Sequence, residues 1–131
     1  MQPLYITLLL FSLSALACSS IENCICTDEF VTIRVTVVDK NNSPVTGLIT
    51  KVRDVTGKIY NVSEYRYPEP GVYNIMTDGY VRSFTTLPKE IIFSGKSDSL
   101  EVTGNFLVNT SECKCHVNKV NGPDTLVAVK R

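Results

Sequence analysis

The sequence predicts an all-β protein, folded as a single antiparallel β-sandwich of about seven strands behind an N-terminal signal peptide. Short stretches rich in valine, isoleucine and threonine alternate apolar with polar residues, which is the pattern of half-buried strands. Glycine, proline, asparagine and aspartate separate these stretches, as turns do in all-β folds. With 131 residues, the chain is long enough for one domain with one modest core.

The first strand is expected over residues 30–39, where alternate apolar side chains share one face: Val31, Ile33, Val35 and Val37. A turn over residues 40–47 leads to a second strand over residues 48–55. After a tight turn, a third strand follows over residues 59–62. We expect these three consecutive strands to pair as a meander.

The second half of the chain continues in the same way. Residues 72–76 are expected to be extended, and the pair Asp78-Gly79 is typical of a hairpin turn after them. The longest alternation covers residues 99–108, and Gly104 in its middle predicts a β-bulge. Shorter extended segments are expected over three further ranges: residues 90–93, 113–117 and 125–129.

An export signal is expected over residues 1–17. The segment from Leu4 to Ala17 is apolar and uncharged, and it is shorter than the roughly 20 residues that span a bilayer. Two small residues, Ala15 and Ala17, precede Cys18 at the positions where a signal peptidase accepts only small side chains.

The stretch LSALAC, which ends at Cys18, resembles a bacterial lipobox. This resemblance implies diacylglycerol on the Cys18 sulfur, a further acyl chain such as palmitate on its amino group, and permanent membrane anchoring. Ser19 is similar to the residue that directs lipoproteins to the outer membrane. Cysteine parity agrees, because five cysteines with one lipidated leave four to pair. The alternative is ordinary secretory cleavage after Ala17, which would give a secreted protein with a free Cys18 thiol.

A family resemblance covers residues 30–80. A strand ending in Asp leads through Pro-Val-X-Gly at residues 44–47, and Pro-Gly-X-Tyr follows at residues 70–73. These motifs resemble the carboxypeptidase-regulatory-like and transthyretin-like domains. The resemblance implies a transthyretin-like or immunoglobulin-like sandwich over residues 30–131, with a structural or binding role and no chemistry of its own. Together with the lipobox, the stretch CKCHVNKVNGPD is similar to small lipoproteins of the Bacteroidetes type.

Four cysteines form two Cys-X-Cys pairs, one in a tether over residues 18–29 and one near the C-terminus: Cys24, Cys26, Cys113 and Cys115. On extended chain, residues two apart point the same way, so two such segments side by side can form two disulfides. Antiparallel segments would join Cys24 to Cys115 and Cys26 to Cys113, whereas parallel segments would join Cys24 to Cys113 and Cys26 to Cys115. An exported protein is expected to be oxidised.

The same four cysteines, with His116, offer a second interpretation as a thiolate site for zinc or copper(I), and a third as a redox-active dithiol. Structural zinc sites commonly use Cys-X2-Cys spacing, and His116 would face away from Cys115 on an extended strand. We therefore favour disulfides, and we expect no metal and no cofactor.

Few residues suggest catalysis or nucleic-acid binding. The chain has one histidine, and thirteen basic residues balance thirteen acidic ones, so neither an enzyme nor a nucleic-acid partner is expected. Tyr65, Arg66 and Tyr67 are candidates for ligand contact, because tyrosine offers a flat apolar face with a polar edge. The sequence thus favours a non-catalytic cell-envelope lipoprotein that binds a protein or glycan or serves a structural role. The alternatives are a metal-binding envelope protein and a secreted transthyretin-like extracellular protein.

Overall fold

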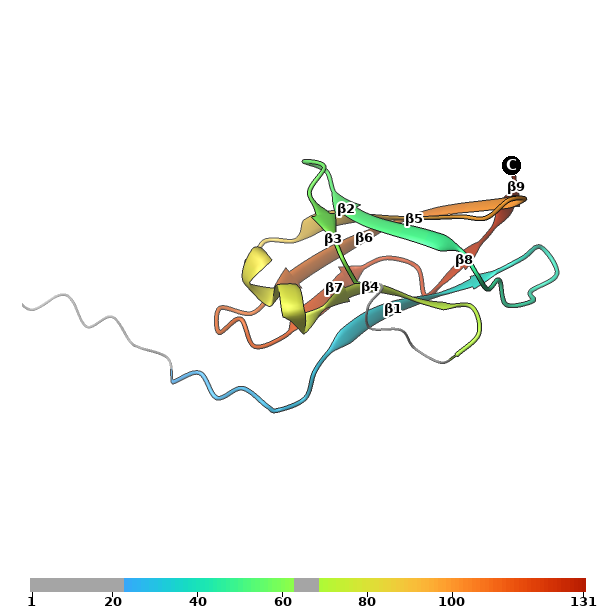
Figure 1. Ribbon diagram of the computed structural model, residues 1–131. Coiled ribbons are helices and arrows are strands. Elements are labelled where there is room, and N and C mark those ends of the chain that lie inside the picture. Colours follow the sequence, from blue (N-terminus) through green and yellow to red (C-terminus); the bar gives the residue numbers. More distant parts are fainter. Residues whose placement is uncertain (1–22, 63–68) are drawn as a thin grey trace, which may run out of the picture.

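The computed structural model describes residues 23–62 and 69–131, which form a β-sandwich of two packed sheets (Figure 1). The elements are β1 (Thr32–Val38), β2 (Ile49–Asp54), β3 (Ile59–Tyr60), β4 (Val72–Thr77), the 3-10 helix η1 (Asp78–Ser83), β5 (Lys89–Lys96), β6 (Leu100–Thr110), β7 (Val117–Asn121), β8 (Thr125–Val127) and β9 (Val129–Lys130). One sheet has the order β4-β1-β8. The other has the order β3-β2-β5-β6-β7, with β9 also paired to β6. The predicted all-β sandwich is confirmed.

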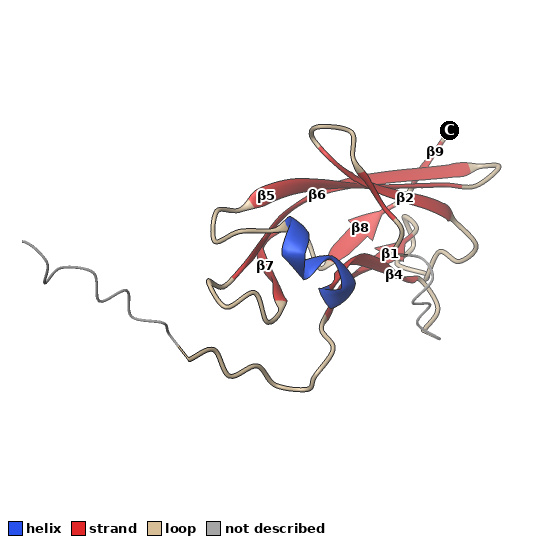
Figure 2. Cartoon of the chain, turned by 60° about the vertical axis from the view of Figure 1, so that its left-hand side comes forward, coloured by secondary structure: helices blue, strands red, loops and turns tan. Residues whose placement is uncertain are grey.

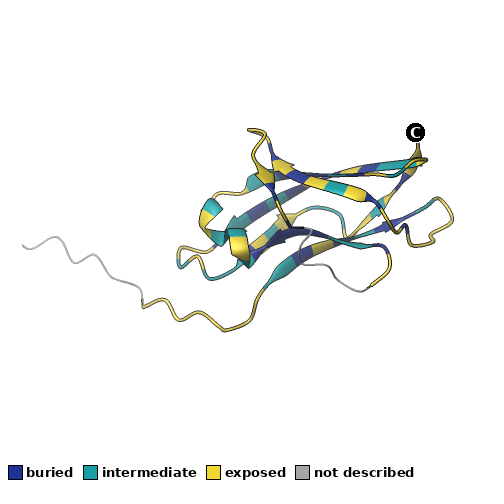
Figure 3. Ribbon diagram, viewed as in Figure 1, coloured by how far each residue is buried: buried dark blue, intermediate teal, exposed yellow. Residues whose placement is uncertain are grey.

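Along the strands, buried residues alternate with exposed or half-buried ones (Figure 3). The apolar side chains of the buried residues form one core cluster. In β6, Val102, Phe106 and Val108 are buried, while the residues of the opposite parity are exposed or half-buried. The largest fully buried side chains come from both sheets and from the end of η1: Tyr60, Phe84, Phe93, Phe106, Ile75, Met76, Ile91, Val35, Val37, Val52, Val108 and Val117. The alternation of apolar and polar residues in the sequence therefore predicts which face of the strand is buried in the core.

The expected three-strand meander was wrong in its first pairing. After β1 the chain folds back on itself, where Val38 bridges Pro44 and the Val45 N–H donates to the Val37 carbonyl. Gly47, with a φ of 74°, then turns the chain into the other sheet, so β2 starts across the core from β1. Of the three strands in the expected meander, only β2 and β3 pair with each other. The pairing of β1 with β8 is parallel, while the remaining strand pairs are antiparallel.

The hairpin turn expected at Asp78-Gly79 was also wrong, because these residues begin η1. A two-residue hairpin would keep the next strand beside β4 in the same sheet. Instead, β5 lies in the other sheet, and η1 carries the chain across the roughly 10 Å between the layers. Phe84, fully buried, fixes the end of this crossing in the core.

Gly104 does not form the predicted bulge. It pairs in register with Phe93, and the irregularity in β6 lies between Leu107 and Val108. A Cβ atom on Gly104 would lie 2.7 Å from Leu126 Cδ1 of the opposite sheet. A larger residue here would displace the Leu126 side chain, so glycine suits the close approach of the two sheets.

A buried carboxylate closes the β2–β3 hairpin. Asp54 Oδ1 accepts hydrogen bonds from the backbone N–H groups of Thr56 and Lys58, at 3.0 and 3.1 Å, and Oδ2 accepts one from the Tyr60 hydroxyl at 3.0 Å. The side-chain hydrogen bond from Thr56 contributes most to holding the pKa of Asp54 at about 2, against the opposing effect of burial. Burial, followed by the bond to Asp54, raises the pKa of Tyr60 to about 12. This network fixes the hairpin at the end of the sandwich where η1 also lies.

Two glycines, Gly57 and Gly71, have left-handed backbone, but only Gly71 is closely packed. Alanine variants of the two can therefore distinguish the cost of backbone strain from the cost of a steric clash. Gly71 has a φ of 76°, and a Cβ atom there would lie 2.9 Å from the Val37 carbonyl oxygen. Gly57 has a φ of 91° with nothing within 4 Å of its Cβ position. We expect Gly57→Ala to cost about 1–2 kcal/mol of unfolding free energy through backbone strain alone. Gly71→Ala should lose about 1–3 kcal/mol more, because the backbone of β1 must move.

Urea unfolding of both variants, with the m-value checked for each, measures this difference. Equal losses would contradict the close contact between Gly71 and β1.

Candidate functional site

Segments that are far apart in the sequence meet at one end of the sandwich, here called the disulfide end. It comprises residues 23–31, the loop over residues 111–116, η1 with the connection over residues 84–88, and the turn of the β2–β3 hairpin over residues 55–59 (Figures 1 and 2). Both Cys-X-Cys pairs and the single histidine lie there. This end is the candidate functional site because it holds most of the residues that the sequence singled out.

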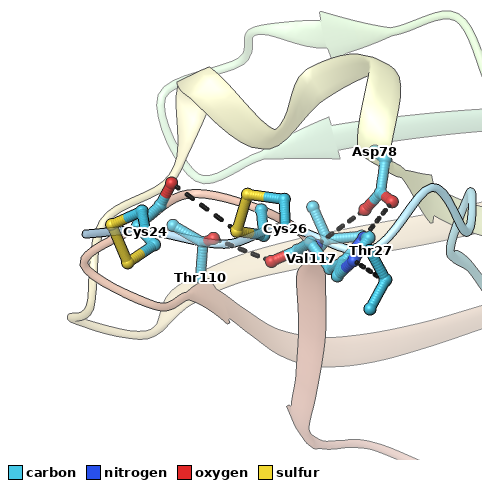
Figure 4. The surroundings of a disulfide bond; sticks show 9 residues. Cys24, Cys26, Thr27, Asp78, Thr110 and Val117 are labelled. Atoms are coloured by element: carbon cyan, nitrogen blue, oxygen red, sulfur yellow. Dashed lines mark hydrogen bonds and ion pairs between the residues drawn. A yellow bond between two sulfur atoms is a disulfide. The ribbon is translucent and has the colours of Figure 1, made fainter.

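Two disulfides attach the N-terminal segment to the loop (Figure 4). Cys24 is bonded to Cys113 and Cys26 to Cys115, with Cα atoms 5.4 and 5.3 Å apart. The predicted disulfides are confirmed, and the connectivity is that of parallel segments. The expected strand over residues 113–117 was wrong, since β7 begins only at Val117. Lys114, between the two cysteines, has a φ of 49° and therefore breaks an extended conformation.

The bridges use the sulfur atoms of both Cys-X-Cys pairs, so none of these four cysteines offers a thiolate to zinc or copper in this form. His116 is engaged in hydrogen bonds of its own. Within residues 23–62 and 69–131, no group of three or more His, Cys, Asp or Glu side chains could hold a metal ion.

A hydrogen-bonded chain of three side chains lies beside the bridges. His116 Nδ1 lies 2.6 Å from Asp78 Oδ2, and Nε2 lies 2.9 Å from Thr27 Oγ1. The carboxylate also accepts bonds from the backbone N–H groups of Val31 and Val117, both at 2.8 Å. The sequence did not predict this cluster, because Asp78-Gly79 has the pattern of a turn and the three side chains are far apart in the chain.

The electrostatics of Asp78 favour an ionised carboxylate. Burial raises the pKa of this carboxyl group, but the hydrogen bonds from His116 and the two backbone amides lower it by more, so the pKa lies below its ordinary value. The His116 Nδ1–H donates to this carboxylate. Because a threonine hydroxyl can either donate or accept, Thr27 can bond Nε2 of both the neutral and the protonated imidazole. The chain of contacts therefore does not depend on the charge of His116.

The order hydroxyl, imidazole, carboxylate is that of a nucleophilic triad, but the contacts of Asp78 indicate a structural role. Its two backbone partners stand at the entry to β1 in one sheet and at the first residue of β7 in the other. The buried Thr110 hydroxyl donates to the His116 carbonyl at 2.7 Å and holds the loop on β6. The cluster thus joins both sheets and, through Thr27, the N-terminal segment.

The remaining predicted site residues belong to the expected lipid anchor and to the tyrosine stretch. Cys18, Tyr65, Arg66 and Tyr67 lie outside the described residues. A groove of about 460 Å³ lies between residues 46–50 and 69–74, so it adjoins the tyrosine stretch in sequence. The Tyr73 hydroxyl in this groove donates to the Val45 carbonyl and accepts from the Leu48 N–H, which indicates a structural role for that tyrosine.

Among the residues that the structure describes, no helix is long and apolar enough to cross a membrane. No protein-family model, no curated protein and no solved structure matches the chain.

The two disulfides close nearly the same loop, so their contributions to stability should be strongly non-additive. Each bridge joins residues 89 positions apart. On the chain-entropy model, closing such a loop stabilises the protein by about 4–5 kcal/mol. Replacing one pair, Cys24→Ser with Cys113→Ser, should cost much less than this, since Cys26–Cys115 still closes the loop. Removing both pairs should cost most of the full amount.

Denaturant unfolding of the single-bridge and bridge-free variants measures these losses, and Cys26→Ser with Cys115→Ser serves as the matched single-bridge control. Additive losses, or alkylation of any of the four thiols in unreduced denatured protein, would contradict the two parallel bridges.

Asp78 should make the free energy of unfolding depend on pH in the acid range. Because the folded pKa is lowered, its stabilisation is present above the ordinary carboxyl pKa near about 4 and is lost as the pH falls through the folded value. At pH 7, Asp78→Asn should lower the free energy of unfolding by about 1–3 kcal/mol through weakened hydrogen bonds. This difference from the wild type should shrink as the pH falls below about 4.

Melting temperatures across pH for Asp78→Asn test this, with the exposed Asp98→Asn as a control for the change in charge. A loss that stays constant down to low pH would show that the ionised carboxylate is not what stabilises this end.

Proposed function

We propose that the protein is a non-catalytic lipoprotein of the bacterial cell envelope, in which a β-sandwich module is anchored to the outer membrane through Cys18. The observation that carries this proposal is the pair of disulfides. They fasten the chain to the sandwich at Cys24 and Cys26, only a few residues after the cysteine that the lipobox resemblance marks for lipid attachment. A short segment fastened this way suits a module tethered close to a surface.

The oxidised state of these cysteines supports an exported location, since disulfides persist outside the cytosol. The tether does not pull directly on the first strand, because the bridges and the Thr27–His116 bond attach it to the sandwich before β1 begins. Force on a lipid anchor would therefore pass through covalent bonds to the loop before β7, and the pairing of β1 with β4 and β8 would be protected.

The role of the module is binding or structural, as the resemblance to transthyretin-like domains implies. A protein or glycan partner of the envelope would contact Tyr65, Arg66 and Tyr67. The groove beside β4 supports this location, because it is lined by the residues that follow this stretch in the chain. The cluster of Thr27, His116 and Asp78 serves as a structural junction in this proposal.

Cys18→Ser should release the protein from the membrane. Wild-type protein from its native membrane should carry the mass of diacylglycerol and a further acyl chain on Cys18. The variant should remain unprocessed or be soluble without detergent. Intact-mass spectrometry combined with membrane fractionation measures both results.

Soluble wild-type protein with a free amino terminus at residue 18 would replace this proposal with that of a secreted extracellular protein. Ester hydrolysis that requires both Thr27 and His116 would contradict the non-catalytic part of the proposal.

A further inference from the structure

We infer that the disulfide end of the sandwich is a membrane-contact surface, which rests on phospholipid headgroups with Ile25 and Leu87 inserted among them. The inference rests on the proposed lipid anchor at Cys18 and goes beyond it, because anchoring alone leaves the orientation of the module open. Three properties of the disulfide end carry it: the length of the tether, the exposed apolar side chains, and the balance of charge.

The tether is too short to let the disulfide end leave the surface. Cys18 and Cys24 are six residues apart in the sequence, so their Cα atoms are at most about 20 Å apart. Cys24 is bonded to Cys113 in the loop at this end. The sandwich is longer than the tether, since the eleven residues of β6 extend over about 35 Å. The disulfide end therefore stays near the bilayer, whereas the opposite end can lie far from it.

The two bridges set this short distance. Without them, the tether could extend as far as Val31, whose backbone N–H is held by the Asp78 carboxylate. Its reach from Cys18 would then be about 45 Å. The disulfides thus hold the disulfide end against the surface as well as stabilising the fold.

Exposed apolar side chains are present at the end that the tether holds near lipid. Ile25, between the two bridged cysteines, is 92% exposed, and Leu87, in the connection from η1 to β5, is 76% exposed. The Leu87 connection adjoins the cysteine loop, since the Thr110 N–H donates to the Thr85 carbonyl at 2.9 Å. Single exposed apolar residues are ordinary in soluble proteins, but several at the end that the tether holds near lipid indicate a contact surface.

The β2–β3 hairpin adds two more exposed apolar side chains, Val55 and Ile59, at the same end. Asp54, the last residue of β2, pairs with Ile91 near the start of β5, so the hairpin turn points toward the disulfide end. The Lys58 amino group confirms this position, because it donates to the Ser83 hydroxyl at the end of η1.

Charge at this end is mixed, so a lipid surface would be recognised by apolar insertion. In the part of the chain that the structure describes, this end carries exposed residues of both charges. The basic ones include Lys58, Arg82 and Lys114, and the acidic ones include Asp28, Glu29 and Glu112. Because neither sign dominates, we expect the contact to depend little on salt and little on the fraction of anionic lipid.

The absence of tryptophan from the chain allows a direct test. Leu87→Trp and Ile25→Trp each introduce one tryptophan at the disulfide end. Ile49→Trp is the matched control, because Ile49 is 82% exposed and pairs with Lys96 at the opposite end of the sandwich. Each full-length lipidated protein is reconstituted in vesicles of phosphatidylethanolamine and phosphatidylglycerol, with and without brominated acyl chains. Interfacial side chains lie roughly 5–10 Å deep, so we expect roughly twofold quenching and a blue shift at positions 25 and 87.

The expected result is quenching at positions 25 and 87, none at position 49, and no change at high salt. Equal quenching at all three positions, or none at any of them, would overturn the inference in protein whose lipidation has been verified by mass, and would leave the proposed anchor intact. Quenching that high salt abolishes would also overturn it, because apolar insertion does not depend on salt. A mass without lipid on Cys18 would overturn the proposed function itself and the inference with it.

Discussion

The Asp78 carboxylate is the point where the two sheets and the N-terminal segment are joined. It accepts hydrogen bonds from the backbone beside β1, from the first residue of β7, and from His116, which in turn contacts Thr27. A largely buried carboxylate is stable only when such partners compensate for lost hydration. The same requirement makes the carboxylate an effective junction, since each partner must stay in place for the group to remain satisfied. Its position at the first residue of η1 puts it between the layers, where elements of both sheets are within reach.

Sequence patterns predicted which side chains are buried but not which strands are neighbours. Burial in β1 and β6 follows from alternation within each strand, which is a local property of the chain. Sheet membership is not local. The fold-back at Val38 and Pro44 sends β2 to the other layer, and η1 does the same for β5. Near the C-terminus, buried Ala128 separates β8 in one sheet from β9 in the other, so one short segment joins both layers. A turn and a crossing of this length can have similar composition, and only the packing of the whole domain separates them.

In the candidate site too, local features could be predicted from the sequence, whereas contacts between distant segments could not. Disulfides could be predicted from cysteine spacing and an exported location, whereas their connectivity depends on the relative direction of two distant segments. The junction of Thr27, Asp78 and His116 could not be predicted, because Asp-Gly is a common turn dipeptide and nothing local relates it to a histidine almost forty residues later. The left-handed backbone conformation of Lys114 could not be predicted either, because the composition of the surrounding stretch suits a strand.

Two bridges that close nearly the same loop need a reason other than stability, because the entropy of loop closure is largely gained with the first. One bridge fixes a point of the tether on the sandwich and leaves the segment free to rotate about that point. A second bridge two residues further along fixes the direction in which the chain leaves the domain. Thr27, the next residue, is then held against His116, and the path to β1 is set. For a module fastened to a surface a few residues away, direction determines which face meets that surface. The parallel arrangement of the bridges is therefore a constraint on orientation as much as on folding.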